Sequence, residues 1–134
     1  MTKDDLKQYV SIKKELEQIQ FKLKELEERK TSIKSMVISD MNAQTSHNNN
    51  SIEDLIIKIE ECIEEYSKKE IELYNKQLEI EKCINDLDPI ERIVMRMRYM
   101  EGKKWEEIAY KIHYEWRQTH YIHKKALKKI VGDN

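Results

Sequence analysis

The chain has 134 residues, of which 38% are charged, two are Gly and one is Pro, and its formal net charge is −1. This Lys- and Glu-rich, turn-poor composition favours an all-α fold over a sheet protein, and the length allows one domain or two small ones. No apolar run approaches the roughly 18 residues of a membrane span and the N-terminus does not resemble a signal peptide, so we expect a soluble, intracellular protein without a membrane partner.

Residues 3–38 are predicted to form a first long helix. Its apolar side chains follow alternating steps of three and four residues for nearly four heptads, which indicates coiled-coil packing. The seam consists of Tyr9, Ile12, Leu16, Ile19, Leu23, Leu26, Ile33 and Val37. The next stretch is small and polar, with three consecutive Asn, and predicts a loop at about 39–51.

A second helix of similar length is predicted from Ser51 to Leu87. Ser51 with Asp54 three residues later resembles a capping box at its start. Its seam is Ile52, Leu55, Ile59, Cys62, Tyr66, Leu73, Ile80 and Leu87. Two helices of equal length joined by one loop predict a long antiparallel hairpin over residues 1–87. Extra apolar positions on the second helix leave surface for the C-terminal module or for another copy, so we expect a homodimer and assign the hairpin to oligomerisation or partner binding.

The two cysteines are predicted to stay reduced. Cys62 and Cys83 lie 21 residues apart on one predicted helix, which places them roughly 30 Å apart at ~1.5 Å per residue, far beyond the ~7 Å limit for a disulfide. Free thiols fit a reducing compartment, although a bridge between two chains stays open.

The C-terminal stretch, residues 88–134, is predicted to be a separate module of three short helices. Asp88, Pro89 and Glu91 are a helix start, because Asp can accept a bond from a free N–H group and Pro fits the first helical position. Gly102 can end this helix in the left-handed conformation. The second helix has Trp105, Ile108, Ala109 and Ile112 on one face, and after a turn at residues 113–115 the third has Thr119, Ile122, Ala126, Leu127 and Ile130.

Charge separates this module from the rest of the chain. Residues 1–88 contain 14 Lys or Arg against 20 Asp or Glu, a net −6, whereas residues 89–134 contain 11 against 6, a net +5. No acidic residue lies between Trp116 and Gly132. The basic end is where a surface for nucleic acid is expected.

The spacing of the last helix, behind Arg98, Tyr99, Gly102, Trp105, Glu107, Ile108 and Ala109, resembles region 4 of sigma-70-type factors, a helix-turn-helix that binds promoter DNA. The chain is more similar still to small phage proteins of the RinA/ArpU kind, regulators of late transcription that place such a module after a charged helical hairpin. Ile122, His123, Ala126 and Leu127 are typical of that group. The resemblance covers about a third of the chain, and the remainder matches in layout. It implies a DNA-binding transcription regulator of phage or prophage type, acting in the cytoplasm of the bacterial host cell.

The resemblance also implies which residues contact DNA. The recognition helix, at about 116–130, would lie in the major groove, and a helix so placed reads bases mainly from its N-terminal half. Position by position, the base-facing candidates are Trp116, Arg117, His120 and Tyr121, and Gln118 borders this surface. Arg117 could hold guanine through two donors. The candidates for phosphate contacts are Lys124, Lys125, Lys128, Lys103 and Lys104.

Two residues depart from the family pattern at the start of the recognition helix. Glu115 stands where the family usually has Ser; it is a weak cap, although its charge suits the positive end of the helix dipole. Trp116 stands where the family usually has a polar residue. It could pack on thymine methyl groups or belong to a protein interface, and the sequence does not decide between these.

Other functions are open at this stage. The basic face could be a solvated surface of an ordinary helical bundle. The hairpin could be the active part of a protein-binding adaptor or inhibitor, or the chain could be a small DNA-packaging protein like a terminase small subunit, although those usually place the DNA-binding part first. A small module touches few base pairs, so useful specificity needs a second copy about one helical turn away, ~34 Å, or RNA polymerase as partner.

No catalytic site, metal site or cofactor is expected. The sequence has no Gly-rich phosphate loop, no HExxH pattern and no Ser or Cys nucleophile with a nearby base. His113, His120 and His123 invite a zinc hypothesis, but no Cys lies nearby and no fourth ligand is obvious.

Overall fold

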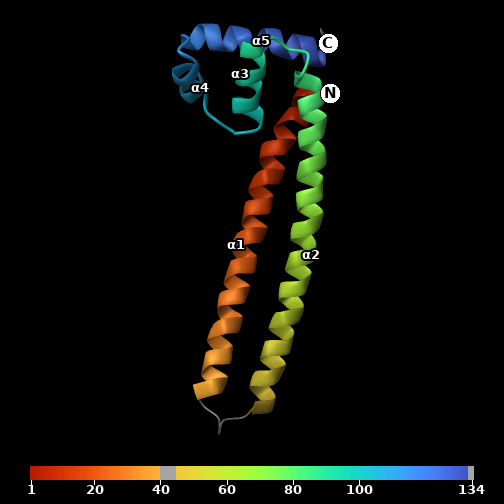
Figure 1. Cartoon of the computed structure of the whole chain (residues 1–134), viewed down its shortest axis with the longest axis vertical. Helices are drawn as coiled ribbons and strands as arrows, with labels where there is room; N and C mark the ends of the chain where they lie inside the picture. Colours follow the sequence, from red (N-terminus) through yellow and green to blue (C-terminus); the bar gives the residue numbers. More distant parts are fainter. Residues whose placement is uncertain (40–44, 133–134) are drawn as a thin grey trace. The chain divides into compact units, whose positions relative to one another are not determined.

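The computed structural model of the chain describes residues 1–39 and 45–132, with side chains for residues 1–36 and 51–132. These ranges contain five helices and no strand, so the predicted all-α class is confirmed (Figure 1). The helices are α1 (Lys3–Ser39), α2 (Thr45–Ile84), α3 (Pro89–Tyr99), α4 (Trp105–Ile112) and α5 (Trp116–Val131). Within the described part of the chain, no helix is long and apolar enough to cross a membrane.

The start of α2 differs from the prediction. The helix begins at Thr45, so Ser51 lies inside it and does not cap its start, and part of the predicted loop at 39–51 is helical. The six residues from Thr45 to Asn50 include neither Gly nor Pro. Polar residues such as Asn, Ser and Thr cost at most ~0.7 kcal/mol each in a helix, so the helix can extend through them. Residues 40–44 of the predicted loop lie outside the described residues.

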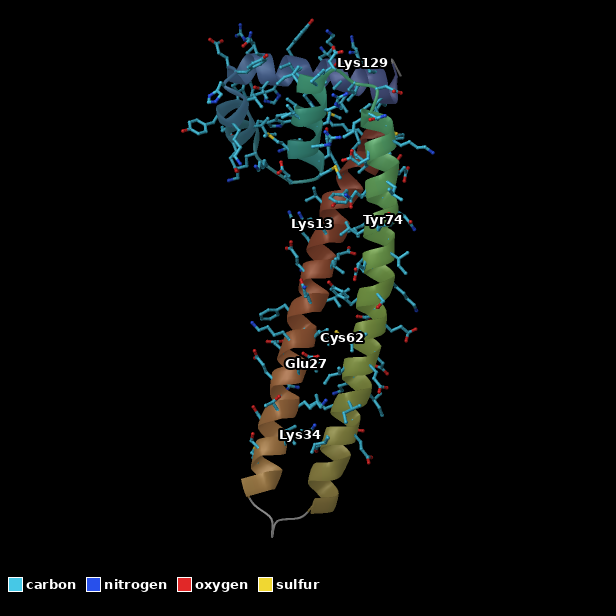
Figure 2. The ribbon with its side chains drawn as sticks, in the orientation of Figure 1. Lys13, Glu27, Lys34, Cys62, Tyr74 and Lys129 are labelled. Atoms are coloured by element: carbon cyan, nitrogen blue, oxygen red, sulfur yellow. The ribbon has the colours of Figure 1, made fainter. Side chains whose placement is uncertain are left out.

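Residues Lys14–Ile71 form one of two compact units. Within it the middle of α1 and the first half of α2 pack around Leu26, Leu55, Ile59 and Cys62, with Ile19, Leu23 and Ile33 against them. Cys62, labelled in Figure 2, donates from its thiol to the Ile19 carbonyl oxygen at 3.7 Å. All the buried side chains of this core belong to the predicted seams, so the heptad spacing identified them.

The second compact unit joins the two ends of the chain, Met1–Lys13 and Glu72–Asn134. One cluster of buried side chains draws on four helices and on Leu87 between α2 and α3: Leu6, Tyr9, Ile80, Ile84, Leu87, Met95, Tyr99 and Ala126. Residues 88–134 therefore share a core with the first turns of α1 and the last turns of α2. Whether 1–87 and 88–134 fold as separate domains stays a prediction.

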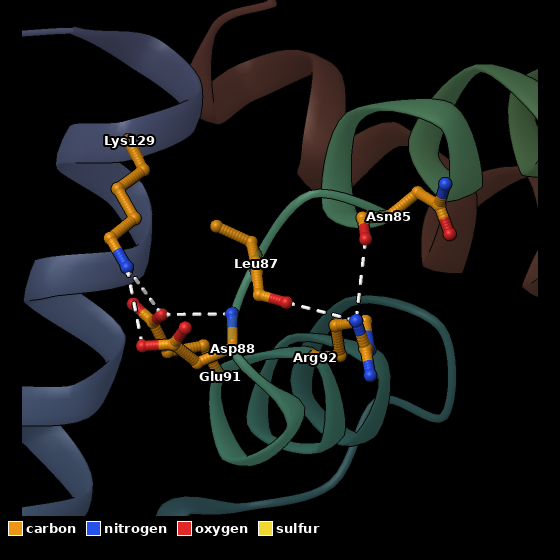
Figure 3. Close-up of polar contacts among 6 residues, drawn as sticks. All are labelled: Asn85, Leu87, Asp88, Glu91, Arg92 and Lys129. Carbon is orange, nitrogen blue, oxygen red and sulfur yellow. Dashed lines mark hydrogen bonds and ion pairs between the residues drawn. The ribbon is translucent and has the colours of Figure 1, made fainter.

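The helix start predicted at Asp88 and Pro89 is confirmed, and the Glu91 side chain bonds back to the N-cap residue Asp88 (Figure 3). Glu91 Oε1 accepts a hydrogen bond from the Asp88 N–H at 3.1 Å and lies 2.7 Å from Lys129 Nζ of α5. The Glu91 side chain is only 3% exposed. Arg92 donates to the carbonyl oxygens of Asn85 and Leu87, at 3.3 and 2.9 Å. These contacts tie the end of α2, the start of α3 and the end of α5 together.

Gly102 lies in the short segment that connects α3 to α4. Its φ of +69° is left-handed, as predicted, but the helix already ends at Tyr99 with Met100 as its C-cap, so Gly102 does not end α3 itself. A Cβ atom at this position would lie 3.3 Å from Val10 Cγ1, so the missing side chain also allows a close approach to α1.

Candidate nucleic-acid interface

A three-residue turn joins α4 to α5, at the positions that the sequence predicts. His113 ends α4 in the left-handed conformation, with φ 59° and ψ 37°. The Tyr114 N–H donates to the Ala109 carbonyl oxygen at 3.1 Å, which satisfies a carbonyl of the last turn of α4. Such a turn brings α5 back across α4, and both helices pack on α3 in the same unit.

Glu115 is the N-cap residue of α5. The Glu115 side chain makes no cap hydrogen bond. Its carbonyl oxygen accepts from both the N–H and the Oγ1 of Thr119, each at 2.9 Å, and Thr119 is fully buried. The weak capping expected of Glu115 agrees with this geometry, and its carboxylate stays at the positive end of the helix dipole.

The two faces of α5 differ in exposure. Thr119, His123 and Ala126 are buried against the rest of the unit. Most of the predicted DNA-contact residues lie on the opposite, exposed side: Trp116, Arg117, Gln118, Tyr121, Lys124, Lys125 and Lys128. With no acidic residue from 116 to 132, this side of α5 is a surface of cations and aromatic rings that we name the α5 outer face.

Lys103 and Lys104 precede α4 on the segment from α3. Lys104 is exposed at the N-cap of α4, while Lys103 is half-buried and its Nζ lies 3.8 Å from Glu101 Oε2. The Lys103 ammonium lies beside that of Lys111 and, through hydrogen bonding and repulsion, lowers the pKa of Lys111. Glu101 and Glu107 act on Lys111 in the opposite direction, so these lysines are partly compensated by carboxylates.

His120 is the predicted contact that lies apart from the α5 outer face. It is half-buried, and its ring centroid is 4.5 Å from that of Trp105 and 3.9 Å from that of Trp116. Its Nε2 atom is buried and has no hydrogen-bond partner in the described part of the chain. The predicted contact between His120 and a base stays a prediction, but the ring is packed between two indoles.

The ring cluster continues inward to a buried polar pair. Trp105 lies 4.5 Å from His123 between ring centroids, and the Arg98 guanidinium lies 4.6 Å from the Trp105 centroid. His123 Nε2 and the Tyr99 hydroxyl are 2.6 Å apart. Tyr99 and His123 are buried and Trp105 is half-buried, so these rings belong to the packing of the unit.

Burial sets the protonation of this pair. The pKa of His123 is lowered to about 4, mainly by burial, with smaller contributions from the neighbouring Lys3, His120 and Arg98. Burial raises the pKa of Tyr99 to about 12. At neutral pH the imidazole is therefore uncharged and the phenol keeps its proton, so Tyr99 can donate to Nε2 of His123.

Two exposed aromatics near the turn were not among the predicted site residues. Tyr110, on α4, is 82% exposed and Tyr114, in the turn, is 42% exposed. Both fall outside the apolar spacing that places Ile108, Ala109 and Ile112 inward. For Tyr110, the available signal was an aromatic residue off the core face of a short amphipathic helix.

Among the described residues, no group of three or more His, Cys, Asp or Glu side chains is arranged to hold a metal ion. Searches of protein-family models, of curated proteins and of solved structures find nothing that matches this chain.

Proposed function

We propose that this chain is a sequence-specific DNA-binding regulator of transcription, of the phage or prophage type. In this proposal α4 and α5 are a helix-turn-helix like that of sigma-70 region 4, and α5 is the recognition helix in the major groove. Residues 1–87 are a long antiparallel hairpin that binds a partner, either a second copy of the chain or RNA polymerase.

The observation that carries the proposal is that α5 has one buried face and one exposed face rich in cations and aromatic rings. Its inner face is fixed by Thr119, His123 and Ala126, so the α5 outer face is held on a rigid element. Arg117 and Tyr121 are one turn apart on that face, and Lys124, Lys125 and Lys128 follow toward the C-terminus. This order matches a recognition helix, whose first turns meet base edges and whose flanking cations meet phosphates.

Apolar surface on the long helices supports a partner for the hairpin. In the unit of Lys14–Ile71, Ile57, Ile63 and Ile71 of α2 and Phe21 of α1 are exposed, each by 46% or more. Exposed apolar side chains at several positions of one element favour a protein contact. The same observation supports the second candidate function, a protein-binding adaptor in which DNA binding is secondary.

Selection of binding sites from random duplex DNA tests the proposal, followed by fluorescence anisotropy at several salt concentrations. We expect one enriched site, and Arg117→Ala/Tyr121→Ala should weaken binding to it by at least about fivefold, since one bidentate contact contributes about 1–3 kcal/mol. The matched control is Arg29→Ala/Tyr74→Ala, which removes one exposed cation from α1 and one exposed ring from α2, outside the apolar surface and outside the α5 outer face.

The outcomes separate the candidates. A palindromic site would add support for a dimer. Weak binding that falls steeply with salt, without an enriched site and without an effect of the α5 substitutions, would mean a basic surface only and would refute the specific reader. Loss of regulatory activity in a separate Phe21→Ala variant, with activity kept in the α5 variant, would favour the adaptor.

A further inference from the structure

Trp116 is a large apolar side chain that α5 keeps in solvent. It is the first residue of α5, is 55% exposed and lies beside the half-buried ring of His120. Burial of an indole would stabilise the fold, but Trp116 packs on one side only, so part of its apolar surface stays in water. Its other side is available to a ligand.

The position of Trp116 is fixed by a chain of ring contacts. His120 fills the space between Trp116 and Trp105, at centroid distances of 3.9 and 4.5 Å. Trp105 is in turn held by His123, at 4.5 Å, and by the guanidinium of Arg98, at 4.6 Å. The inner end of this chain is buried and the outer end is Trp116, so the exposed indole is held in place before any ligand arrives.

His120 is poorly placed to read a base itself. Its Nε2 is buried without a partner in the described residues, and the ring lies against two indoles that are tilted to it by 42° and 53°. To donate or accept at a base edge through Nε2, the ring would have to leave the space between Trp105 and Trp116. Its spacing of four residues from Trp116 instead makes it a support for that side chain.

We propose that Trp116 contacts the methyl group of one thymine in the bound DNA, and that His120 is the positioning residue that holds Trp116 for this contact. The inference rests on the proposed function, because it requires α5 in the major groove. Among the base edges exposed in that groove, the thymine C5-methyl is the apolar group, whereas the other groups are hydrogen-bond donors and acceptors. The exposed indole surface, already held in position, can make an apolar contact with that methyl group.

Replacement of thymine by deoxyuridine tests the contact directly, because it removes the methyl group and keeps every hydrogen bond of the base pair. Each thymine of the selected site is replaced in turn, and affinity is measured by anisotropy for the full chain. We expect one position at which uracil weakens binding about fourfold, the effect of losing one buried methyl group. In Trp116→Ala the two DNAs should bind equally, which is the coupling that a double-mutant cycle measures.

His120 is tested by the same ratio of thymine to uracil affinity. His120→Ala should bring the ratio close to one, and His120→Phe should restore it, since Phe can fill the space between the two indoles. Acrylamide quenching of tryptophan fluorescence in the free protein should increase in His120→Ala and not in His120→Phe. Tyr110→Ala is the control, because it removes an exposed ring outside the ring cluster and should leave the ratio unchanged.

The results separate this inference from the proposed function. An enriched site whose binding is indifferent to uracil at every thymine, or is unchanged in Trp116→Ala, overturns the inference and leaves the DNA reader standing; Trp116 would then belong to a protein interface. A selected site without thymine overturns it as well. If no site is enriched, the proposed function and the inference fall together.

Discussion

Replacement of His123 by Gln should reduce the loss of folding stability that this protein shows as the pH falls. His123 is buried on α5 beside Tyr99, and burial lowers its pKa from the usual 6.5 to about 4. Gln keeps an acceptor for the Tyr99 hydroxyl but cannot take up a proton in this range. The comparison therefore isolates the protonation of one ring.

The sign and size follow from the two pKa values. The folded state holds the His123 ring uncharged, whereas in the unfolded chain the ring binds a proton below pH 6.5. The free energy of unfolding is therefore not reduced by His123 above pH 6.5, and it falls as the pH drops from 6.5 toward 4. At pH 5.0 the difference is about 1.5 pH units, or ~2 kcal/mol at 1.36 kcal/mol per unit. Because partial access of solvent screens the ring, we expect about 1–2 kcal/mol.

Urea denaturation of both proteins at pH 7.5 and 5.0 measures this effect. Between the two pH values, the free energy of unfolding of the wild type should fall by about 1–2 kcal/mol more than that of His123→Gln. Tyr99→Phe is the control: it removes the hydrogen bond, leaves the buried ring to titrate and should keep the pH dependence. Parallel curves for the wild type and His123→Gln would refute the argument that burial suppresses the pKa of His123.

Substitutions at three further positions test the fold. Gly102→Ala should lower the free energy of unfolding by about 1–2 kcal/mol, because φ is left-handed and the new Cβ would lie 3.3 Å from Val10 Cγ1; thermal melting measures the change. Glu91→Ala should cost about 1–2 kcal/mol by loss of the α3 cap, and Glu91→Gln should recover part of it, as measured by urea denaturation. Leu6→Ala should cost about 2–5 kcal/mol and shift the unfolding transition that fluorescence of Trp105 and Trp116 reports, because Leu6 is fully buried in the core of their unit.

The helices could be predicted where the sequence contains a local signal. Asp88 with Pro89 starts α3, Gly102 takes the left-handed conformation after it, and the seam spacing identifies the buried residues of α1 and α2. The start of α2 was predicted wrongly because neither Gly nor Pro interrupts the polar residues after Thr45. A capping pattern such as that of Ser51 also occurs inside a helix, where its side chain has no free N–H group to satisfy.

The candidate site was accessible to sequence reasoning only in part. The exposure of Arg117, Tyr121 and the lysines of α5 follows from helical periodicity alone. The packing of His120 against Trp105 does not, because it depends on how α4 crosses α5. Helical spacing shows that two residues share a face, but the side chain that fills the gap between two helices is decided by the crossing angle.

The composition of the second core decides which part of the chain can carry the proposed function. Five of its eight buried side chains precede Asp88: Leu6, Tyr9, Ile80, Ile84 and Leu87. Lys3 also contributes to the low pKa of His123, so the first turn of α1 lies within electrostatic reach of the ring cluster. A fragment of residues 88–134 would expose the remaining side chains of that core and lose most of the burial that holds α5. The ends of α1 and α2 that the sequence assigns to the hairpin are thus structural parts of the proposed DNA reader. Substitutions in them should lower the stability of the core against which α5 packs.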